Sequence, residues 1–181
     1  LGQLALRSST LFTNVERKEF HDKGWERRDK EHLAPHLLAC IRHYGLISSW
    51  ASSVVLLQDT LVMRRKALAK LLNAIDILIE MGDFQSALML LSGVGSSCVY
   101  RLKHTRASLS AREKEIYETA NELFNCDSRF KNLRMAQKER MARRDRMVPH
   151  LGLFLTDLTF IEEGDPPEEV GLNRDKVIDE I

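Results

Sequence analysis

The spacing of apolar residues constrains the fold of this chain more than any other feature. Apolar side chains recur at steps of three and four residues along almost the whole length, and the alternation typical of strands is scarce. Steps of three and four residues place side chains on one face of a helix, whereas a strand has a period of two. The sequence therefore predicts an all-α fold in which apolar helix faces form the core.

Cap residues predict where several of these helices begin and end. Pro35 suits the first turn of one helix, and we expect Gly45 to interrupt that helix before it resumes. Gly82 suits the end of the next long helix, and Asp83 can cap the helix after it. Ser110, with a glutamate three residues later, forms a capping box ahead of a further apolar stripe.

Composition and charge narrow the class of protein. A length of 181 residues suits one domain that can bury a large core without disulfide bonds. The net charge of +1 argues against a dedicated nucleic-acid binder, which would normally be strongly basic. Three scattered cysteines fit a reducing compartment, and no apolar run approaches the roughly 20 residues that span a bilayer. We therefore expect a cytoplasmic domain, and the missing initiator Met suggests a piece of a longer sequence.

Residues 148–167 break a local rule of helix composition. Their apolar side chains leave almost no polar face, so a helix here is packed nearly all round or offers apolar surface to a partner. Gly164 and the prolines after it end the helix, which places Glu162 and Glu163 in its last turn. Two carboxylates at the negative end of the helix dipole are unfavourable, and such conflicts tend to mark functional sites. The alternative is a buried helix whose two glutamates simply reach into water.

Residues 129–146 form a strongly basic segment. They hold eight Lys and Arg side chains against Glu139 and Asp145. Phe130 and Leu133 help to give this helix one packed side, so most of the charge is interpreted as solvated surface. The alternative is contact with anionic lipid headgroups, to which each well-placed basic side chain contributes about 1 kcal/mol. Such contact would recruit the domain to membranes.

One set of residues superficially resembles metal ligands on a helix. Its members, three or four residues apart, are His32, His36, Cys40 and His43. Pro35 weakens the metal interpretation, because His32 then precedes the helix. We favour a structural interpretation in which Cys40 is a small core residue and the histidines are exposed or hydrogen-bonded. The sequence therefore predicts no metal site. It also predicts no covalent catalysis, because no phosphate loop, catalytic triad or suitable pair of carboxylates is evident.

Several blocks of the chain resemble one known family in their order and spacing. The segment from Val148 contains Val-Pro, Leu-Gly, Leu-Thr-Asp-Leu and Glu-Glu-Gly in that order. Further blocks lie at residues 25–31, 35–42, 46–50 and 84–103, so the resemblance covers nearly the whole chain. Together the blocks resemble the RasGEF domain, the catalytic domain of guanine nucleotide exchange factors for Ras-family small GTPases. Residues 1–181 are therefore expected to form one RasGEF-like catalytic domain.

The resemblance implies a multi-helix domain with a protruding helical hairpin. In the family, this hairpin inserts beside the nucleotide site of the bound GTPase and displaces its first switch region. By position, the acidic residue at the helix end is Glu163, and Thr159 lies one turn earlier, facing the magnesium site. A carboxylate there would repel phosphate oxygens and take their place as the anion that the GTPase's own cations contact. The nucleotide and magnesium belong to the partner, so the resemblance implies no cofactor in this chain.

The resemblance also implies an apolar pocket for the second switch region of the GTPase. The matching positions are Ile41, Leu88, Phe130 and His150, with Arg42, Ser92, Gly95 and Lys103 nearby on the contact surface. His150 replaces the family's Phe or Tyr, and Gly95 replaces a common Asn, so anchoring is expected to be weaker or tuned to a different GTPase. Without the resemblance, Ile41, Leu88 and Phe130 would be interpreted as ordinary core residues.

The chain also lacks parts of the family's pattern. Residues 142–147 stand in place of a common Pro-Pro-Cys, and Arg174 replaces a usual aromatic residue. We expect the N-terminal companion module to be absent and the domain to be truncated at its C-terminal end. The late apolar residues would then lack covering helices and form an exposed patch; they are Val170, Leu172, Val177, Ile178 and Ile181.

Two functions remain open from the sequence. The first is nucleotide exchange, which is catalysis by differential binding without covalent chemistry, on a GTPase of the Ras, Rap or Ral type. The second is a non-catalytic helical adaptor that binds a small GTPase without exchange activity. The two hypotheses differ in the nucleotide state that the protein prefers.

Overall fold

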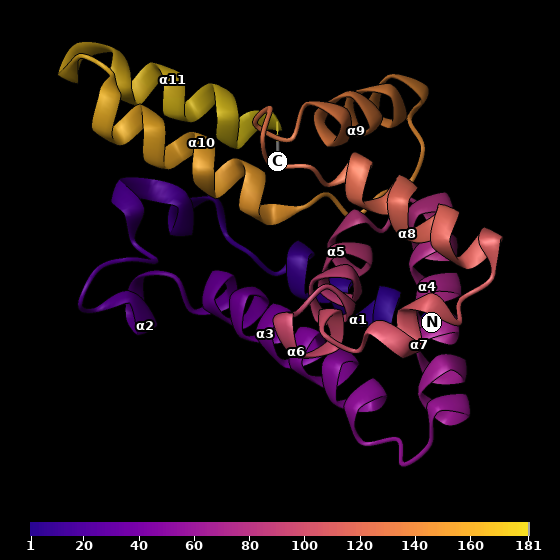
Figure 1. The fold of residues 1–181 in the computed structure, drawn as a ribbon. Helices are drawn as coiled ribbons and strands as arrows, with labels where there is room; N and C mark the ends of the chain where they lie inside the picture. Colours follow the sequence, from indigo (N-terminus) through magenta and orange to yellow (C-terminus); the bar gives the residue numbers. More distant parts are fainter. Residues whose placement is uncertain (181) are drawn as a thin grey trace. The chain divides into compact units, whose positions relative to one another are not determined.

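The structure is a computed structural model that describes residues 1–180, without the side chains of residues 167 and 168. Helices make up most of the described chain, which confirms the predicted all-α fold (Figure 1). They are α1 (Gly2–Thr13), the 3-10 helix η1 (Arg17–Lys23), α2 (Lys30–Leu33), α3 (Pro35–Leu56), α4 (Leu61–Met81), α5 (Phe84–Val94), α6 (Ser97–Tyr100), α7 (Lys103–Ala107), α8 (Ala111–Leu123), α9 (Lys131–Arg143), α10 (Leu151–Gly164) and α11 (Pro167–Glu180).

The chain divides into two compact units. Unit 1 comprises Leu1–Ala5 and His43–Pro149, and unit 2 comprises Leu6–Arg42 and His150–Ile181. Helix α3 is continuous across the boundary between residues 42 and 43. Gly45 therefore does not interrupt this helix, contrary to the sequence expectation. A single glycine inside a helix costs only about 1 kcal/mol, which the packing of neighbouring turns offsets.

Unit 1 is built around α4, which packs against α5, α7 and α8. Thr60 caps the start of α4 by accepting a hydrogen bond from the amide of Met63, and Gly82 ends the helix with a left-handed φ of 79°. Asp83 caps α5 through a 2.9 Å bond from the Ser86 amide to its carboxylate. These contacts confirm the predicted limits at Gly82 and Asp83, because both residue types satisfy the free backbone groups of a helix end.

The crossing of α3 and α5 depends on Gly93. A Cβ atom at this position would lie 2.5 Å from the carbonyl oxygen of Ser48 and 2.6 Å from the Cβ of Ala51. The hydroxyl of Ser52 donates a 2.8 Å hydrogen bond to the Gly93 carbonyl across the same crossing. The two helix backbones therefore approach more closely than a side chain at residue 93 would permit.

Unit 2 is organised around a fully buried carboxylate on η1. Glu19 is 0% exposed, and its Oε2 accepts hydrogen bonds of 2.9 Å from the backbone amides of His36 and Leu37. These are free amides of the first turn of α3, so Glu19 acts as a cap from a distant segment. The same unit holds a core cluster with residues from η1, α3, α10, α11 and the segment after η1; it includes Phe20, Trp25, Leu37, Leu151, Leu158 and Ile178.

Helices α10 and α11 form a hairpin within unit 2 (Figure 1). Gly164 is the last helical residue of α10, and Asp165 leaves the helix with an extended backbone. The expected exposed patch on the second arm is only partly present, which corrects that prediction. Ile178 is buried in the core cluster and Val177 packs against it, whereas Leu172 is exposed. Ile181 lies outside the described residues.

Candidate functional site

The last turn of α10 presents its two glutamates to different surroundings. The side chain of Glu162 is 17% exposed and that of Glu163 is 62% exposed. Neighbouring residues on a helix point about 100° apart, which explains the difference. Glu163 is therefore the carboxylate that a molecule approaching from solvent would meet.

Both glutamates have cationic partners from other segments of unit 2. Lys23 Nζ donates a hydrogen bond of 2.6 Å to Glu163 Oε1. Arg174 on α11 lies 3.5 Å from Glu162 and 3.1 Å from Asp22. These cations offset the unfavourable charge at the end of the helix dipole. Sequence reasoning missed both partnerships, because no local pattern joins residues so far apart in the chain.

Thr159 lies one turn before Glu163 on the same face of α10. Its hydroxyl donates a 2.8 Å hydrogen bond to the Leu155 carbonyl, and its side chain is partly exposed. This bond within the helix satisfies the hydroxyl donor, so the accessible part of the side chain is mainly its small methyl group. The structure thus brings the two candidate catalytic residues onto one helix face, as the spacing of four residues predicted.

Three more candidate residues belong to unit 2. Ile41 is 43% exposed, so the ordinary core interpretation of this residue is wrong. The adjacent Arg42 forms an exposed ion pair of 3.0 Å with Glu31. His150 precedes α10 as its N-cap residue, and burial lowers the pKa of its ring from 6.5 to about 4. The ring is therefore neutral near pH 7 and can occupy an apolar environment without a charge.

Leu88 and Ser92 lie on the one accessible strip of α5 in unit 1. The residues around them in this helix are buried, whereas both of these side chains are partly exposed. They are four residues apart and so share a helix face. The Ser92 hydroxyl is hydrogen-bonded to the Tyr44 hydroxyl, and burial raises the pKa of Tyr44.

The other candidates in unit 1 stand at helix ends. Gly95 is the exposed C-cap residue of α5, and Lys103 is the exposed first residue of α7. Phe130 is the partly exposed N-cap residue of α9 and has a left-handed φ of 56°. Such a backbone is uncommon for a bulky residue. Phe130 and Leu88 therefore both retain accessible apolar surface.

Two members of the histidine and cysteine set, His36 and Cys40, have structural roles. His36 Nδ1 lies 2.6 Å from Glu19 Oε1, and Cys40 is buried in the core cluster of unit 2. Burial also raises the pKa of the Cys40 thiol to about 11. The interpretation of Cys40 as a core residue is confirmed. Within residues 1–180, no group of three or more His, Cys, Asp and Glu side chains has the geometry to hold a metal ion.

The basic segment contains one arginine with a clear structural task. Arg140 is partly buried, and its Nη2 donates hydrogen bonds of 3.2 Å and 2.5 Å to the carbonyls of Ile79 and Glu80 at the end of α4. Most of the other basic residues of this segment are exposed; they are Arg129, Lys131, Lys138, Arg143, Arg144 and Arg146. Across the described part of the chain, no helix has both the length and the apolar composition for crossing a bilayer.

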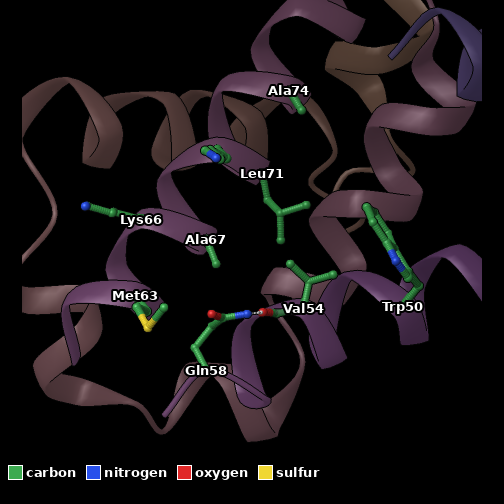
Figure 2. A pocket seen from close by; sticks show the side chains of 9 residues that line it. Trp50, Val54, Gln58, Met63, Lys66, Ala67, Leu71 and Ala74 are labelled. Atoms are coloured by element: carbon green, nitrogen blue, oxygen red, sulfur yellow. Dashed lines mark hydrogen bonds between the residues drawn. The ribbon is translucent and has the colours of Figure 1, made fainter. Parts of the chain in front are cut away.

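An apolar groove of about 470 Å³ lies between α3 and α4 in unit 1. Figure 2 shows Trp50 and Val54 on one helix and Ala67 and Leu71 on the other. Met63 lies at one end, and Lys66 and Lys70 contribute basic groups. None of the residues that line this groove belongs to the candidate set described above.

Comparison with known proteins assigns the chain to a family. The family model of the RasGEF domain matches residues 2–179, a span that includes both compact units. The chain belongs to the RasGEF family. This result confirms the family and the all-α fold that the sequence blocks indicated.

Similar curated proteins carry names that agree with the family. Ras guanine nucleotide exchange factor K of Dictyostelium discoideum is 32% identical over 166 residues, which cover 91% of this chain and 10% of that protein. Ras-specific guanine nucleotide-releasing factor 1 of Rattus norvegicus is 32% identical over 165 residues, covering 91% of this chain and 13% of that protein. The RasGEF match therefore corresponds to a small part of much longer relatives.

Proposed function

We propose that this chain is a RasGEF catalytic domain that accelerates GDP release from a Ras-type small GTPase. The observation that carries the proposal is the family match over residues 2–179, supported by relatives named as Ras exchange factors. Both compact units would contribute to one catalytic domain, because the match spans both. Ras, Rap and Ral types are the candidate partners.

The proposed mechanism uses the hairpin of α10 and α11 as the element that enters beside the nucleotide site. Glu163 would stand where phosphate stands in the nucleotide-bound GTPase, and Thr159 would face the magnesium site. Support for this assignment is the exposure of the Glu163 carboxylate at the end of α10. A fixed negative charge there repels phosphate oxygens and attracts the cations that normally hold them.

Docking of the second switch region would use four candidate anchors, the apolar side chains of Ile41, Leu88 and Phe130 and the neutral ring of His150. Arg42, Ser92, Gly95 and Lys103 would line the surrounding contact surface. Support comes from the exposure of Ile41 and the partial exposure of the other three anchors. A partner that buries these groups gains about 25 cal/mol for each Å² of apolar surface removed from water.

Release of nucleotide follows from linkage between two binding events. An exchange factor that holds the nucleotide-free GTPase tightly weakens nucleotide binding by the same factor. The nucleotide that rebinds then depends on cellular concentrations, and this chain needs no cofactor. We also propose a cytoplasmic location with recruitment to anionic membranes through residues 129–146, where exposed basic side chains gather.

The decisive experiment is a fluorescent-GDP release assay on a panel of Ras, Rap and Ral GTPases. The proposal expects faster release from at least one of them at micromolar concentrations of the chain. Absence of acceleration on every GTPase of the panel would contradict exchange activity.

The second candidate function is an adaptor that binds a GTPase without promoting exchange. The observations that favour it are the histidine at residue 150 and the exposed glycine at residue 95, both departures from the family pattern in the docking surface. An exchange factor binds the nucleotide-free GTPase far more tightly than the GDP or GTP form. Equal affinity for the three forms, measured by titration calorimetry, would favour the adaptor.

A further inference from the structure

The turn at the end of η1 has an uncommon backbone. Asp22 has a φ of 51° and Lys23 a φ of 50°, so two consecutive residues with side chains adopt the left-handed conformation. His21 before them is extended, which makes a sharp kink inside the segment. Non-glycine residues disfavour this region, so the surrounding contacts must hold the turn in place.

The turn directs two opposite charges at the two arms of the hairpin. Lys23 Nζ contacts Glu163 Oε1 on α10 at 2.6 Å. Asp22 contacts Arg174 on α11 at 3.1 Å, and Arg174 also approaches Glu162 at 3.5 Å. Lys23 has a second acidic neighbour in Glu26, at 3.8 Å. The left-handed turn at Asp22 and Lys23 thus brings the ammonium group of Lys23 to Glu163. The proposed function assigns this carboxylate to the nucleotide site.

Lys23 is well placed to compete for this carboxylate. Its side chain is 25% exposed, so much of the aliphatic stem is covered while the ammonium group reaches Glu163. The hydrogen bond to Glu163 raises the pKa of Lys23 further above its usual value of 10.5, so the contact favours the charged ammonium group. Lys23 contacts only Oε1 of this carboxylate, but its positive charge already offsets part of the negative charge that would attract a second cation.

We propose that Lys23 is an internal counter-ion that occupies Glu163 in the free protein and competes with the cations of the GTPase. This inference rests on the proposed role of Glu163 in exchange. Lys23 is then a positioning residue that acts through Glu163 and restrains the exchange rate. Because the pair is open to solvent, its contribution is small and the restraint is modest.

The test is the substitution Lys23→Met, which removes the charge and keeps the length of the stem. We expect kcat/KM for GDP release to rise about twofold to fivefold, the range that an exposed ion pair supports. The matched control is Lys18→Met on the same segment. Lys18 pairs with Glu16 instead of Glu163, so its substitution changes the net charge equally and should leave the rate at the parent value.

A double-mutant cycle separates this role from a structural one. In a Glu163→Gln background, Lys23→Met should have no effect on the rate, because the group through which Lys23 acts is gone. A rate for Lys23→Met at or below the parent value, or an acceleration that persists with Glu163→Gln, would overturn the inference. Circular dichroism reports whether Lys23→Met folds; if it does not, Lys23→Gln takes its place with the same expected results.

Failure of this inference and failure of the proposed function give different results. If the parent chain accelerates GDP release and the Lys23 variants do not differ from it, only the counter-ion inference is wrong. If the parent chain accelerates release from none of the GTPases, exchange activity is wrong and the inference falls with it.

Discussion

At the scale of single residues, the end of α10 shows how one helix turn separates two identical side chains. Glu162 is mostly covered and shares Arg174 with Asp22, so its main effect is to join the two arms of the hairpin. Glu163 is exposed and bound by one lysine. A substitution at either position removes the same charge, yet the expected consequences differ because the neighbours differ.

Glu163→Ala should slow GDP release by at least about tenfold, which corresponds to a loss of roughly 1.4 kcal/mol. Glu163→Gln should lose about as much, because the proposed mechanism depends on charge and not on size. Docking should be largely spared, so the concentration of exchange factor that gives half the maximal rate should change little. Release at the parent rate by Glu163→Ala would mean that the bulk of α10 is sufficient to displace the first switch region.

His150 should make folding stability depend on pH. Burial lowers its pKa from 6.5 to about 4. Between these two pH values, the ring of His150 is protonated in the unfolded chain and neutral in the folded chain. The contribution of His150 to the free energy of unfolding should therefore be fully present above pH 6.5 and be lost as the pH drops toward 4. The loss is roughly 3 kcal/mol at most, since one pKa unit corresponds to about 1.4 kcal/mol.

The check on His150 is denaturant unfolding of the parent and of His150→Phe at several pH values. The variant should lose less stability than the parent on acidification. Parallel curves for the two proteins over this range would show that His150 does not contribute to the pH dependence.

At the scale of elements, α3 and α5 can pack closely because residue 93 of α5 is a glycine and has no side chain. The crossing lies within unit 1, where a Cβ at Gly93 would meet Ser48 and Ala51 of α3. The same helix α5 carries the partly exposed candidates Leu88 and Ser92.

Gly93→Ala should destabilise unit 1 by about 1–3 kcal/mol, because the added Cβ would overlap atoms that cannot move without shifting a helix. The matched control is Gly45→Ala in the same helix pair, where a Cβ meets nothing within 4 Å. Gly45→Ala should stabilise the chain by roughly 0.5–1 kcal/mol, the usual gain in a helix interior. Thermal unfolding of both variants measures these shifts, and a stabilised Gly93→Ala would contradict the packing argument.

At the scale of the whole molecule, the distribution of charge is more informative than the net value of +1. Basic side chains gather on residues 129–146, and Arg140 ties α9 to the end of α4 through the carbonyls of Ile79 and Glu80. The proposed membrane contact would use the exposed members of the segment and leave this tie intact. The segment thus combines a structural contact with a basic surface.

Lys131→Gln and Lys138→Gln should each weaken binding to vesicles that contain phosphatidylserine by about fivefold, from a loss of roughly 1 kcal/mol per charge. The control Lys114→Gln removes an exposed charge from α8 and should leave vesicle affinity unchanged. Co-sedimentation at low and high salt measures the effect. Equal affinities for all three variants and the parent would contradict a membrane contact through this segment.

The sequence by itself determined the helical fold and several of the helix ends. Periodic apolar residues required helices, while Gly82, Asp83 and the capping box at Ser110 fixed ends that the structure confirms. Gly45 was misjudged, because local propensity is weaker than the packing of a continuous helix. The ordered blocks of the chain also identified the RasGEF family and indicated where the candidate site residues lie.

Only the tertiary structure decided what surrounds those residues. Lys23 and Glu163 are separated by 140 positions, and Arg174 and Asp22 by 152, so no local pattern could join them. The cap that buried Glu19 supplies to α3 likewise depends on a contact between distant segments. Periodicity and caps act within a few residues, whereas counter-ions and the exposure of Ile41 are set by the neighbours that folding brings together.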